Sequence, residues 1–332
     1  MKILLAIMQY DYGNSSSGHS YEYTNYYSSL VQMGHEVVLF DYMSELQRHG
    51  KKKMNSMLSD RAKEIRPDLA IFHLYTDQFD VAVIDKSKNY TVTLSIFHDD
   101  TWREQYAIYW AQHFNFFTTP DYFSLRKYLA LGLNGVLFFP YGCNETLYRK
   151  MDAPKVHDVS FVGRWHPYRQ WLVNRIKKAG ISINARGPGW RGGMVDHDEM
   201  VRLFNQSRIN LNFSNSASWD ARYLCSSPRA LIDRLRSRKV VEQLKARHFE
   251  INGCGGFQLS YYVAGLEKLY LIGDEIAIYD APEDMIEKIR FYLKNEDMRE
   301  SIASAGYQRT LSEHTFNKRF GELFNSMGLR NV

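Results

Sequence analysis

The stretch Leu69–Arg103 reads LAIFHLYTDQFDVAVIDKSKNYTVTLSIFHDDTWR and contains two short apolar runs separated by a helix-length segment. The runs Leu69–Leu74 and Val92–Phe97 have the length expected of buried strands. A strand, a helix and a second strand form a βαβ unit, whose strands lie parallel in one sheet with helices covering its faces. This stretch therefore predicts an α/β fold built on a parallel sheet.

The same alternation continues on both sides of this unit. Other strand-length apolar runs in the first part of the chain are Ile3–Met8, Glu36–Tyr42, Phe114–Thr118 and Val136–Pro140. A segment of mixed charge with one proline, Lys150–His157, is typical of a linker. A second series follows, with strands expected at Asp158–Val162, Ile181–Ala185, Arg208–Phe213 and Leu269–Ile272, and helices at Arg169–Ala179, Pro282–Asn295, from Met298 onward and near Phe316–Met327. A chain of 332 residues is long enough for two domains. We expect two Rossmann-like domains, residues 1–150 and 151–312, with ligands at the carboxyl ends of their strands.

The composition favours a globular protein that handles a phosphorylated or acidic ligand. The chain is 45% apolar and 14% aromatic, with a net charge of +5. The three cysteines are widely spaced and form no CxxC pair, which argues against a disulfide framework or a zinc site and favours a reducing, cytoplasmic compartment. The first apolar run is expected to be a strand rather than a signal peptide, and the absence of a run of about 18 apolar residues predicts that no segment spans a membrane.

One motif in the second half combines two acids with a glycine cluster. Glu242 and Glu250 have E-x7-E spacing, and Lys245–Leu259 reads KARHFEINGCGGFQL. On a continuous helix the two acids would lie broadly on one side, because eight residues advance about 800°. Glycines allow a backbone to approach a ligand closely, and helix termini can hold phosphate oxygens. The alternative is two solvated glutamates on a helix surface.

The residues around this motif carry a resemblance to a known family. KARHFEINGCGGFQLSYYVAGLEKLY, together with FHDDTWR at Phe97–Arg103, FPYGCNETLYR at Phe139–Arg149 and SFVGRWHPYR at Ser160–Arg169, resembles the CgeB-like (spore maturation protein family) glycosyltransferases of the GT-B superfamily. The resemblance extends from about residue 65 to residue 320. It implies a GT-B fold of two Rossmann-like domains facing a central cleft, with residues 313–332 forming a helix that crosses back to the first domain. It also implies a nucleotide-sugar donor and no obligatory metal.

The resemblance assigns donor-binding roles to residues of the second half. Glu242 would contact the donor sugar and Glu250 the nucleotide ribose. Cations stabilise the negative charge that develops on the leaving diphosphate. The complete set of donor-binding candidates, with Arg169 as a reserve cation, is Gly163, Arg164, Arg169, Trp190, Lys245, Arg247, Glu250, Gly255, Gly256, Phe257 and Gln258. Trp190 would either stack on the nucleobase or pack in a tight turn.

Candidate acceptor-side residues follow strands of the first half. His98, Asp99 and Asp100 come directly after a predicted strand, where a carboxylate or imidazole could orient or deprotonate an acceptor hydroxyl. The alternative for one of the two aspartates is a cap on the following helix. In the loop after the first strand, Gly18, His19, Tyr21 and Glu22 are expected to face the acceptor, unless the loop has no chemical role. We take Asp100, His98 and Glu242 as the catalytic candidates.

Two further features bear on cofactors and partners. Asp196-His197-Asp198 has the spacing of a metal-binding DxD motif but lies in a polar stretch, so we expect no metal. An arginine-rich segment precedes the acid motif and contains Arg222, Arg229, Arg234, Arg236 and Arg238. These arginines form either a solvated face or a contact with a polyanionic acceptor, such as modified DNA or a phosphate-containing glycan.

These observations predict a glycosyltransferase that moves a sugar from a nucleotide-diphosphate sugar to an acceptor hydroxyl, with a UDP-sugar favoured as donor. The resemblance of the E-x7-E spacing to retaining enzymes favours retention of configuration. Two alternatives remain open. One is a nucleotide-sugar epimerase of the same fold, and the other is a nucleic-acid-binding protein whose transferase site has decayed.

Overall fold

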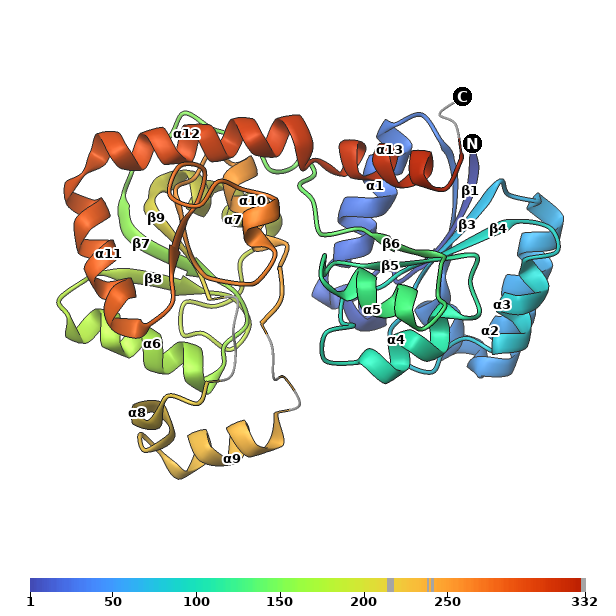
Figure 1. The fold of residues 1–332 in the computed structure, drawn as a ribbon, viewed down its shortest axis with the longest axis horizontal. Helices are drawn as coiled ribbons and strands as arrows, with labels where there is room; N and C mark the ends of the chain where they lie inside the picture. The colour runs from blue at the N-terminus through green and yellow to red at the C-terminus, as the bar shows by residue number, and fades with distance from the viewer. Residues whose placement is uncertain (214–217, 238, 240–241, 330–332) are drawn as a thin grey trace. The chain divides into compact units, whose positions relative to one another are not determined.

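The computed structural model describes residues 1–213, 218–237, 239 and 242–329. The chain forms two compact units, each a parallel β-sheet covered by helices (Figure 1). Unit 1 consists of Met1–Pro140 together with the C-terminal stretch Phe316–Val332, and unit 2 consists of Tyr141–Thr315. The predicted α/β fold with two parallel sheets is confirmed.

Unit 1 contains a six-stranded parallel sheet with strand order β2-β1-β3-β4-β5-β6. Its strands are β1 (Lys2–Ile7), β2 (Glu36–Asp41), β3 (Leu69–His73), β4 (Val92–Ile96), β5 (Phe116–Thr119) and β6 (Val136–Phe138). Its helices are α1 (Ser28–Gln32), α2 (Tyr42–Ile65), α3 (Val81–Ser87), α4 (Glu104–Ala111), α5 (Ser124–Ala130) and α13 (Phe316–Ser326). The bounds of every strand of this unit lie within three residues of those predicted, because strands of a sheet covered on both faces are mainly apolar.

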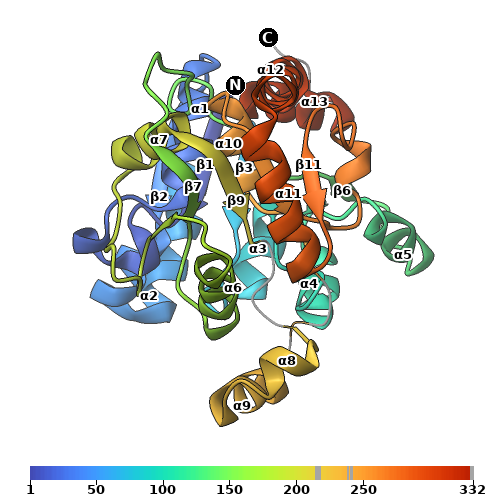
Figure 2. The same cartoon turned by 90° about the vertical axis from the view of Figure 1, so that its left-hand side faces the viewer.

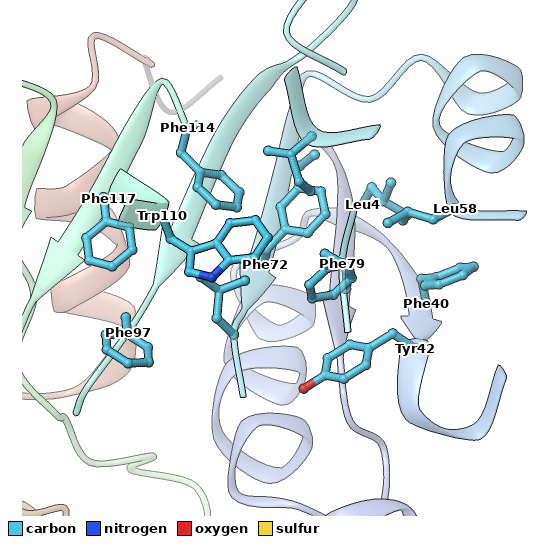
Figure 3. Packing of buried hydrophobic residues seen from close by; sticks show 14 of the residues in the cluster. Leu4, Phe40, Tyr42, Leu58, Phe72, Phe79, Phe97, Trp110, Phe114 and Phe117 are labelled. Atoms are coloured by element: carbon cyan, nitrogen blue, oxygen red, sulfur yellow. The ribbon is translucent and has the colours of Figure 1, made fainter. Parts of the chain in front are cut away.

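The two faces of this sheet carry separate hydrophobic clusters. On one face Leu4 and Phe72 pack with Phe79, Trp110 and Phe117 (Figure 3). The other face is covered partly by the C-terminal helix α13, whose Phe316, Phe320, Leu323 and Phe324 are buried with Ile3, Leu5, Ile7, Tyr26 and Ile71. The predicted C-terminal helix thus completes the core of the first unit.

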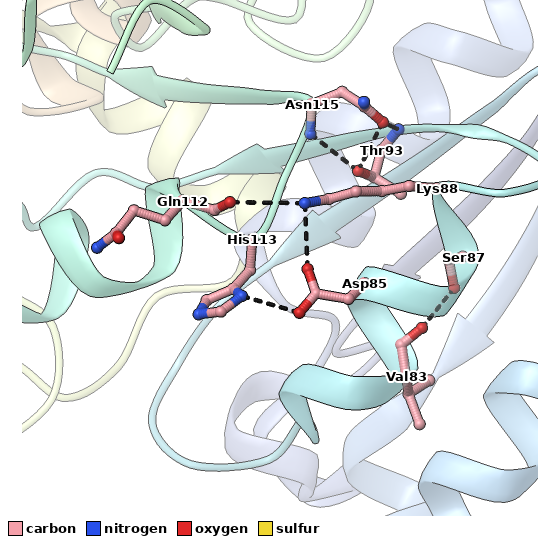
Figure 4. Close-up of polar contacts among 8 residues, drawn as sticks. All are labelled: Val83, Asp85, Ser87, Lys88, Thr93, Gln112, His113 and Asn115. Carbon is pink, nitrogen blue, oxygen red and sulfur yellow. Dashed lines mark hydrogen bonds and ion pairs between the residues drawn. The ribbon is translucent and has the colours of Figure 1, made fainter. Parts of the chain in front are cut away.

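Polar side chains hold strands of unit 1 together at the amino-terminal edge of the sheet (Figure 4). Asn115 Oδ1 accepts hydrogen bonds from the backbone N–H of Thr93 at 2.9 Å and from its hydroxyl at 3.0 Å, which locks β5 against β4. Asp85 accepts from Lys88 at 3.1 Å and lies 3.1 Å from His113, so α3 is tied to the segment that leads into β5. These contacts stabilise the edge opposite the carboxyl ends of the strands.

Unit 2 contains a five-stranded parallel sheet with strand order β11-β10-β9-β7-β8. Its strands are β7 (His157–Val162), β8 (Ile183–Arg186), β9 (Ser207–Asn212), β10 (Gln258–Tyr261) and β11 (Ala277–Tyr279). Its helices are α6 (Pro167–Lys178), α7 (His197–Gln206), α8 (Ala221–Leu224), α9 (Pro228–Arg236), α10 (Arg247–Gly253), α11 (Pro282–Lys294) and α12 (Glu296–Glu313). Strands β7 and β9 are neighbours at the centre of the sheet, so their carboxyl ends lie side by side.

One predicted strand of unit 2 is wrong. Leu269–Ile272 follows a short 3-10 helix, Leu266–Lys268, and forms no strand of the sheet. Leu269 and Tyr270 are buried for another reason, because Tyr270 packs on Phe249 and its hydroxyl lies 2.8 Å from that of Thr310 on α12. The sheet uses β10 and β11 instead, and the sequence prediction missed both.

Helix α10 also differs from the expectation for the two acids. It begins at Arg247, so it contains Glu250, whereas Glu242 lies in non-helical chain ahead of it. The two acids therefore do not share one continuous helix. Among the described residues, no helix is both long and apolar enough to cross a bilayer.

Candidate functional site

Two arginines of unit 2 are anchored at the carboxyl ends of neighbouring central strands. Arg247 Nε donates to the carbonyl oxygen of Val162, the last residue of β7, at 3.3 Å. Arg169, in the first turn of α6, donates to the carbonyl oxygen of Phe213, just beyond β9, at 3.0 Å. Its second donor group reaches the carbonyl of Arg164 at 2.9 Å. Both guanidinium groups are thus fixed at the edge where parallel sheets bind ligands.

Glu250 is buried and holds Arg247 in place. Its side chain is 1% exposed, and one carboxylate oxygen accepts a hydrogen bond from the hydroxyl of Tyr148 at 2.7 Å. The other oxygen forms an ion pair with Arg247, one turn earlier on α10. Glu250 therefore positions Arg247 and Tyr148, and its contact with the nucleotide ribose stays a prediction. The sequence analysis did not select Tyr148.

Glu242 lies in a cationic environment at the same edge. Burial raises the pKa of its carboxyl group to about 7, and Lys245, Lys239 and Arg169 oppose that rise. Burial likewise lowers the pKa of Arg169 to about 10, and Glu242 opposes that fall. Because burial outweighs the nearby cations, Glu242 exchanges its proton near neutral pH and can donate or accept a hydrogen bond there.

The glycine cluster has a different role from the one predicted. Gly255 has a φ of +66° and its N–H donates to the carbonyl of Asn252, while the N–H of Gly256 donates to Ile251. Both N–H groups therefore close the carboxyl-terminal end of α10, where the helix dipole disfavours an anion. The expected diphosphate contact by these backbone groups is contradicted by this geometry.

The two residues after the glycines are also structural. Phe257 is buried and its ring packs on Tyr292, with ring centroids 4.6 Å apart. Gln258 is buried at the start of β10, and its Nε2 donates to the carbonyl of Arg247 at 2.8 Å. Gln258 therefore helps to fix the start of α10 rather than facing a ligand.

The predicted nucleobase loop packs against the turn after β7. Trp190 is 8% exposed, its Nε1 donates to the carbonyl of Gly163 at 2.8 Å, and its ring meets Phe161 edge-on. Gly187 allows this close packing, because a Cβ there would lie 2.5 Å from the Gly163 carbonyl oxygen. Trp190 therefore takes the packing alternative and offers no free face for stacking. Arg164, next to Gly163, has an exposed side chain.

The start of α10 carries the remaining donor candidate, Lys245. Its backbone N–H donates to Nδ1 of His248 at 3.0 Å, and Nε2 of His248 lies 3.1 Å from the hydroxyl of Ser260 on β10. Burial lowers the pKa of His248 to about 4, so the imidazole is neutral and acts as a structural link. The side chain of Lys245 is half-buried and contributes to the cationic environment of Glu242.

In unit 1, the catalytic candidate Asp100 is buried beside β5. It is 2% exposed and accepts hydrogen bonds from the hydroxyls of Thr119 and, at 3.1 Å, Tyr128. Burial raises the pKa of Asp100 to about 6, against the lowering effect of these two hydroxyls. Both hydroxyls bond to Oδ2, whereas the buried Oδ1 has no hydrogen-bond partner among the described residues.

His98 belongs to a polar cluster at the carboxyl ends of β1, β3 and β4. Its Nε2 lies 2.6 Å from the hydroxyl of Tyr26. His73, at the end of β3, pairs with Glu22 at 3.3 Å, and the two imidazole rings are 6.2 Å apart. We refer to Glu22, Tyr26, His73 and His98 as the histidine cluster. Sequence reasoning missed both His73, which is the last residue of β3 and lies inside a predicted strand, and Tyr26, which lies in the helical turn Tyr23–Tyr27 before α1.

The other acceptor-side candidates are mostly structural. Asp99 accepts from the indole N–H of Trp102 at 3.0 Å and its backbone carbonyl closes the turn before α4, but its side chain does not cap α4, whose N-cap residue is Arg103. Tyr21 is half-buried and packs edge-on against Tyr26 and Phe316, and its contact with an acceptor stays a prediction. Gly18 has a φ of +82° in an exposed loop. The exposed ring of His19 stacks on Tyr10 and Tyr23.

The described residues contain no group of three acidic, histidine or cysteine side chains that could hold a metal ion. Within the DxD-like spacing, Asp196 is the N-cap of α7 and accepts from the N–H of Glu199 at 2.7 Å. This helix-capping role accounts for the first aspartate of that spacing.

Two arginines of the basic segment are engaged within the unit. Arg222 donates to Asp220 and to Glu283, each at 2.6 Å, and Arg234 is buried with its guanidinium 4.0 Å from the ring of Trp219. Arg229 lies 3.7 Å from Asp233. Arg236 is exposed, and Arg238 lies outside the described residues. A continuous face of five arginines for a polyanion is therefore not supported.

Comparisons with known proteins agree with the fold. Residues 169–325 match the family described as "Glycosyl transferase-like". No curated protein matches the chain. The chain is similar in structure to sucrose-phosphate synthase from Thermosynechococcus elongatus, with a TM-score of 0.67 and 11% identity over 99% of both chains. It is also similar to HepE from Anabaena in complex with UDP, with a TM-score of 0.63 and 11% identity over 98% of this chain and 100% of that one.

A glycosyltransferase from Rickettsia africae shares the fold as well, with a TM-score of 0.65 and 10% identity over 98% of this chain and 97% of the other. The protein therefore has the GT-B fold of glycosyltransferases, as predicted. More particularly, its second half carries a glycosyltransferase-like sequence from Arg169 to Asn325. The finer assignment to CgeB-like enzymes rests on the sequence resemblance alone.

Proposed function

We propose that this protein is a glycosyltransferase that transfers a sugar from a nucleotide-diphosphate sugar, with a UDP-sugar favoured, to an acceptor hydroxyl. The observation that carries the proposal is the pair Arg169 and Arg247, anchored at the carboxyl ends of β7 and β9 with Glu242 in the same charge environment. The structural similarity to HepE in complex with UDP supports a uridine nucleotide as the first donor to test.

The arginines would stabilise the leaving diphosphate. Charge grows on the phosphate oxygens as the bond to the sugar breaks, and cations already fixed in place stabilise it without reorganisation. Arg247 is held by Glu250 and Val162, and Arg169 by two carbonyl groups, so neither has to be ordered when the donor binds. Arg164 and Lys245 add positive charge at the same edge. This arrangement supports a mechanism in which the protein's own cations stabilise the diphosphate.

Glu242 would contact the donor sugar. With a pKa near 7 it can donate a hydrogen bond to a sugar oxygen when protonated and accept one from a sugar hydroxyl when ionised. Glu250 acts through Arg247 and Tyr148 rather than through the nucleotide. Retention of configuration is proposed from the E-x7-E resemblance, and in that case the departing phosphate would take the acceptor proton.

The histidine cluster of unit 1 supports an acceptor-binding role. Its imidazole and carboxylate groups lie at the carboxyl ends of three neighbouring strands, where they can bind a hydroxyl. His98 would orient the acceptor hydroxyl, and Asp100, which accepts from Thr119 and Tyr128, would have a structural role. The acceptor would be a glycan or small molecule. A polyanionic acceptor, such as DNA, loses its main support because Arg222 and Arg234 have internal partners.

The decisive experiment is a thermal-shift screen of the full chain against UDP-, GDP-, dTDP- and CDP-sugars, followed by an assay of nucleoside diphosphate release with candidate acceptors. A donor stabilises the fold in proportion to RT ln(1 + [L]/Kd). We expect stabilisation by one nucleotide class, and its loss in the Arg169→Ala variant. If no nucleotide sugar stabilises the chain, the proposal fails. Conversion of the donor sugar without any acceptor would favour an epimerase instead.

A further inference from the structure

Helix α9 presents its apolar side to solvent. Leu231, Ile232 and Leu235 are 44%, 46% and 67% exposed, whereas Ala230 and Arg234, on the flank of the helix beyond Leu231, are buried. At about 100° per residue, Leu235 lies about 40° and Ile232 about 100° from Leu231 around the helix axis, so the three form one stripe. In both views α8 and α9 lie away from the sheet of their own unit (Figure 1, Figure 2). Single exposed leucines are ordinary, but a contiguous stripe of this kind marks an interaction surface.

The helix is held in this orientation by contacts of its polar side and of the neighbouring helix α8. Arg234 is buried with its guanidinium against the ring of Trp219. Tyr223 of α8 packs edge-on against Tyr168 and Trp171 of α6, and Arg222 bonds to Glu283 at the start of α11. The outward direction of the leucines is therefore fixed by the packing of the unit.

The charges that border the apolar stripe are positive. Arg236 and Arg229 lie about 140° and 160° around the axis from Leu231, at one margin of the stripe. Both are exposed. Arg229 has one weak ion pair, 3.7 Å from Asp233, and its guanidinium lies 5.6 Å from the ring centroid of Trp165. In the described part of the chain Arg236 forms no ion pair. The one acid on α9, Asp233, is thus offset by a neighbouring arginine.

A tryptophan lies beside the stripe. Trp219 is 63% exposed although one part of its ring contacts Arg234. Indole rings favour the boundary between lipid acyl chains and water, where an apolar body and a polar N–H are both satisfied. Exposed leucines, flanking arginines and an exposed tryptophan together form the pattern of helices that lie in a membrane surface. We refer to Trp219, Arg229, Leu231, Ile232, Leu235 and Arg236 as the α9 surface.

We propose that the α9 surface binds the surface of an anionic lipid membrane, with Leu231, Ile232 and Leu235 entering the acyl boundary and Arg229 and Arg236 contacting lipid phosphates. The charge favours a membrane over a second copy of the chain, because two α9 surfaces packed together would bring their arginines close to one another. This peripheral attachment is independent of the proposed transferase activity and is tested without it.

The test is co-sedimentation of the full chain with vesicles of phosphatidylcholine alone or mixed with phosphatidylglycerol. We expect binding to the anionic vesicles at least tenfold tighter than to the neutral ones, because each surface arginine gains from the anionic headgroups. The double variant Leu231→Ser with Leu235→Ser should lose at least tenfold in affinity. The double variant Arg229→Gln with Arg236→Gln should lose the preference for phosphatidylglycerol while keeping its far-ultraviolet circular dichroism.

Leu271→Ser is the matched control, because Leu271 is 60% exposed in the same unit but outside the α9 surface. It should bind vesicles as the unchanged chain does. Absence of binding to anionic vesicles, or equal binding by the Leu231/Leu235 double variant, would overturn the proposal. A lipid-free dimer that this double variant dissociates would also overturn it and assign the surface to a second copy.

Discussion

Arg247 and Glu250 lie one turn apart on α10 and form an ion pair in which the carboxylate is almost wholly buried while the guanidinium also bonds to the end of β7. The pair therefore connects a helix start to the strand edge where the ligand is proposed to bind. Substitutions at this pair can therefore separate residues that position Arg247 from residues that bind the nucleotide.

Removing the buried acid should destabilise the fold. Glu250→Ala leaves Arg247 and the hydroxyl of Tyr148 without their partner, and loss of one member of a buried ion pair costs about 3 kcal/mol. Glu250→Gln keeps an acceptor for Tyr148 and should cost less. Thermal unfolding of both variants, with Tyr148→Phe for comparison, checks this order. If Glu250→Ala melts like the unchanged chain but no longer binds nucleotide, Glu250 contacts the ligand directly.

Removing the guanidinium of Arg169 should weaken nucleotide binding. We expect Arg169→Ala to raise the Kd for UDP at least tenfold, equivalent to about 1.4 kcal/mol. Arg175→Ala is the control on the same helix, because Arg175 pairs at the surface with Glu283. Calorimetric titration of both variants with UDP tests the assignment, and equal losses in the two would refute it.

The protonation of Glu242 should make stability depend on pH. Its pKa is about 7 in the folded chain and lies near 4.5 when unfolded, so the folded state binds the proton more tightly. Stability from this group is therefore complete below about pH 4.5 and is lost as pH rises through 7, a change of at most about 3 kcal/mol. Glu242→Gln should flatten this part of the profile of melting temperature against pH. An unchanged profile would place Glu242 in a solvated environment.

Asp100 is expected to be a structural residue. Because its pKa is raised to about 6, ionisation at higher pH opposes folding. Asp100→Asn retains an oxygen for Thr119 and Tyr128 and should raise the melting temperature at pH 8 more than at pH 4. Activity should survive this substitution and fall in His98→Ala. Loss of turnover in Asp100→Asn with unchanged KM would instead identify Asp100 as the catalytic base.

The glycines after α10 should matter for stability rather than for nucleotide affinity. A Cβ at Gly256 would lie 2.7 Å from Asn210 Nδ2, so Gly256→Ala should cost about 1–3 kcal/mol through overpacking. Gly255→Ala should cost about 1 kcal/mol because of its positive φ. Gly265→Ala provides a control with positive φ and open space around it. Unchanged Kd for UDP in the folded variants is the expected result.

Much of the fold could be predicted because strands buried on both faces have an unmistakable pattern. Ile3–Met8 is apolar throughout, Val92–Phe97 is interrupted only by Thr93 and Ser95, and each became a strand within a residue or two. Leu269–Ile272 is an equally apolar run, but it forms a turn rather than a strand. Its Tyr270 is buried against Phe249, about twenty residues earlier in the chain, and the local sequence does not reveal that contact. Short β10 and β11 offer too few residues for the pattern to be distinctive.

The site could be predicted only in part, for a related reason. Arg247 and Arg169 were selected from motifs, and the structure brings both to strand ends. The motif did not reveal that the N–H groups of Gly255 and Gly256 are already bonded within the helix cap. Residue type and spacing indicate which groups are present, whereas availability for a ligand depends on backbone pairing and on partners such as Tyr148, about a hundred residues away.

Because α13 packs into the sheet of the first unit, that unit is discontinuous in the sequence. During synthesis, Ile3, Tyr26 and Ile71 leave the ribosome long before Phe316, Phe320 and Phe324, which cover them. The earliest part of the chain therefore keeps an apolar face uncovered until α13 has been synthesised. Truncation after Pro140 would make this unfinished state permanent, and such a fragment is expected to aggregate unless the last helix is supplied.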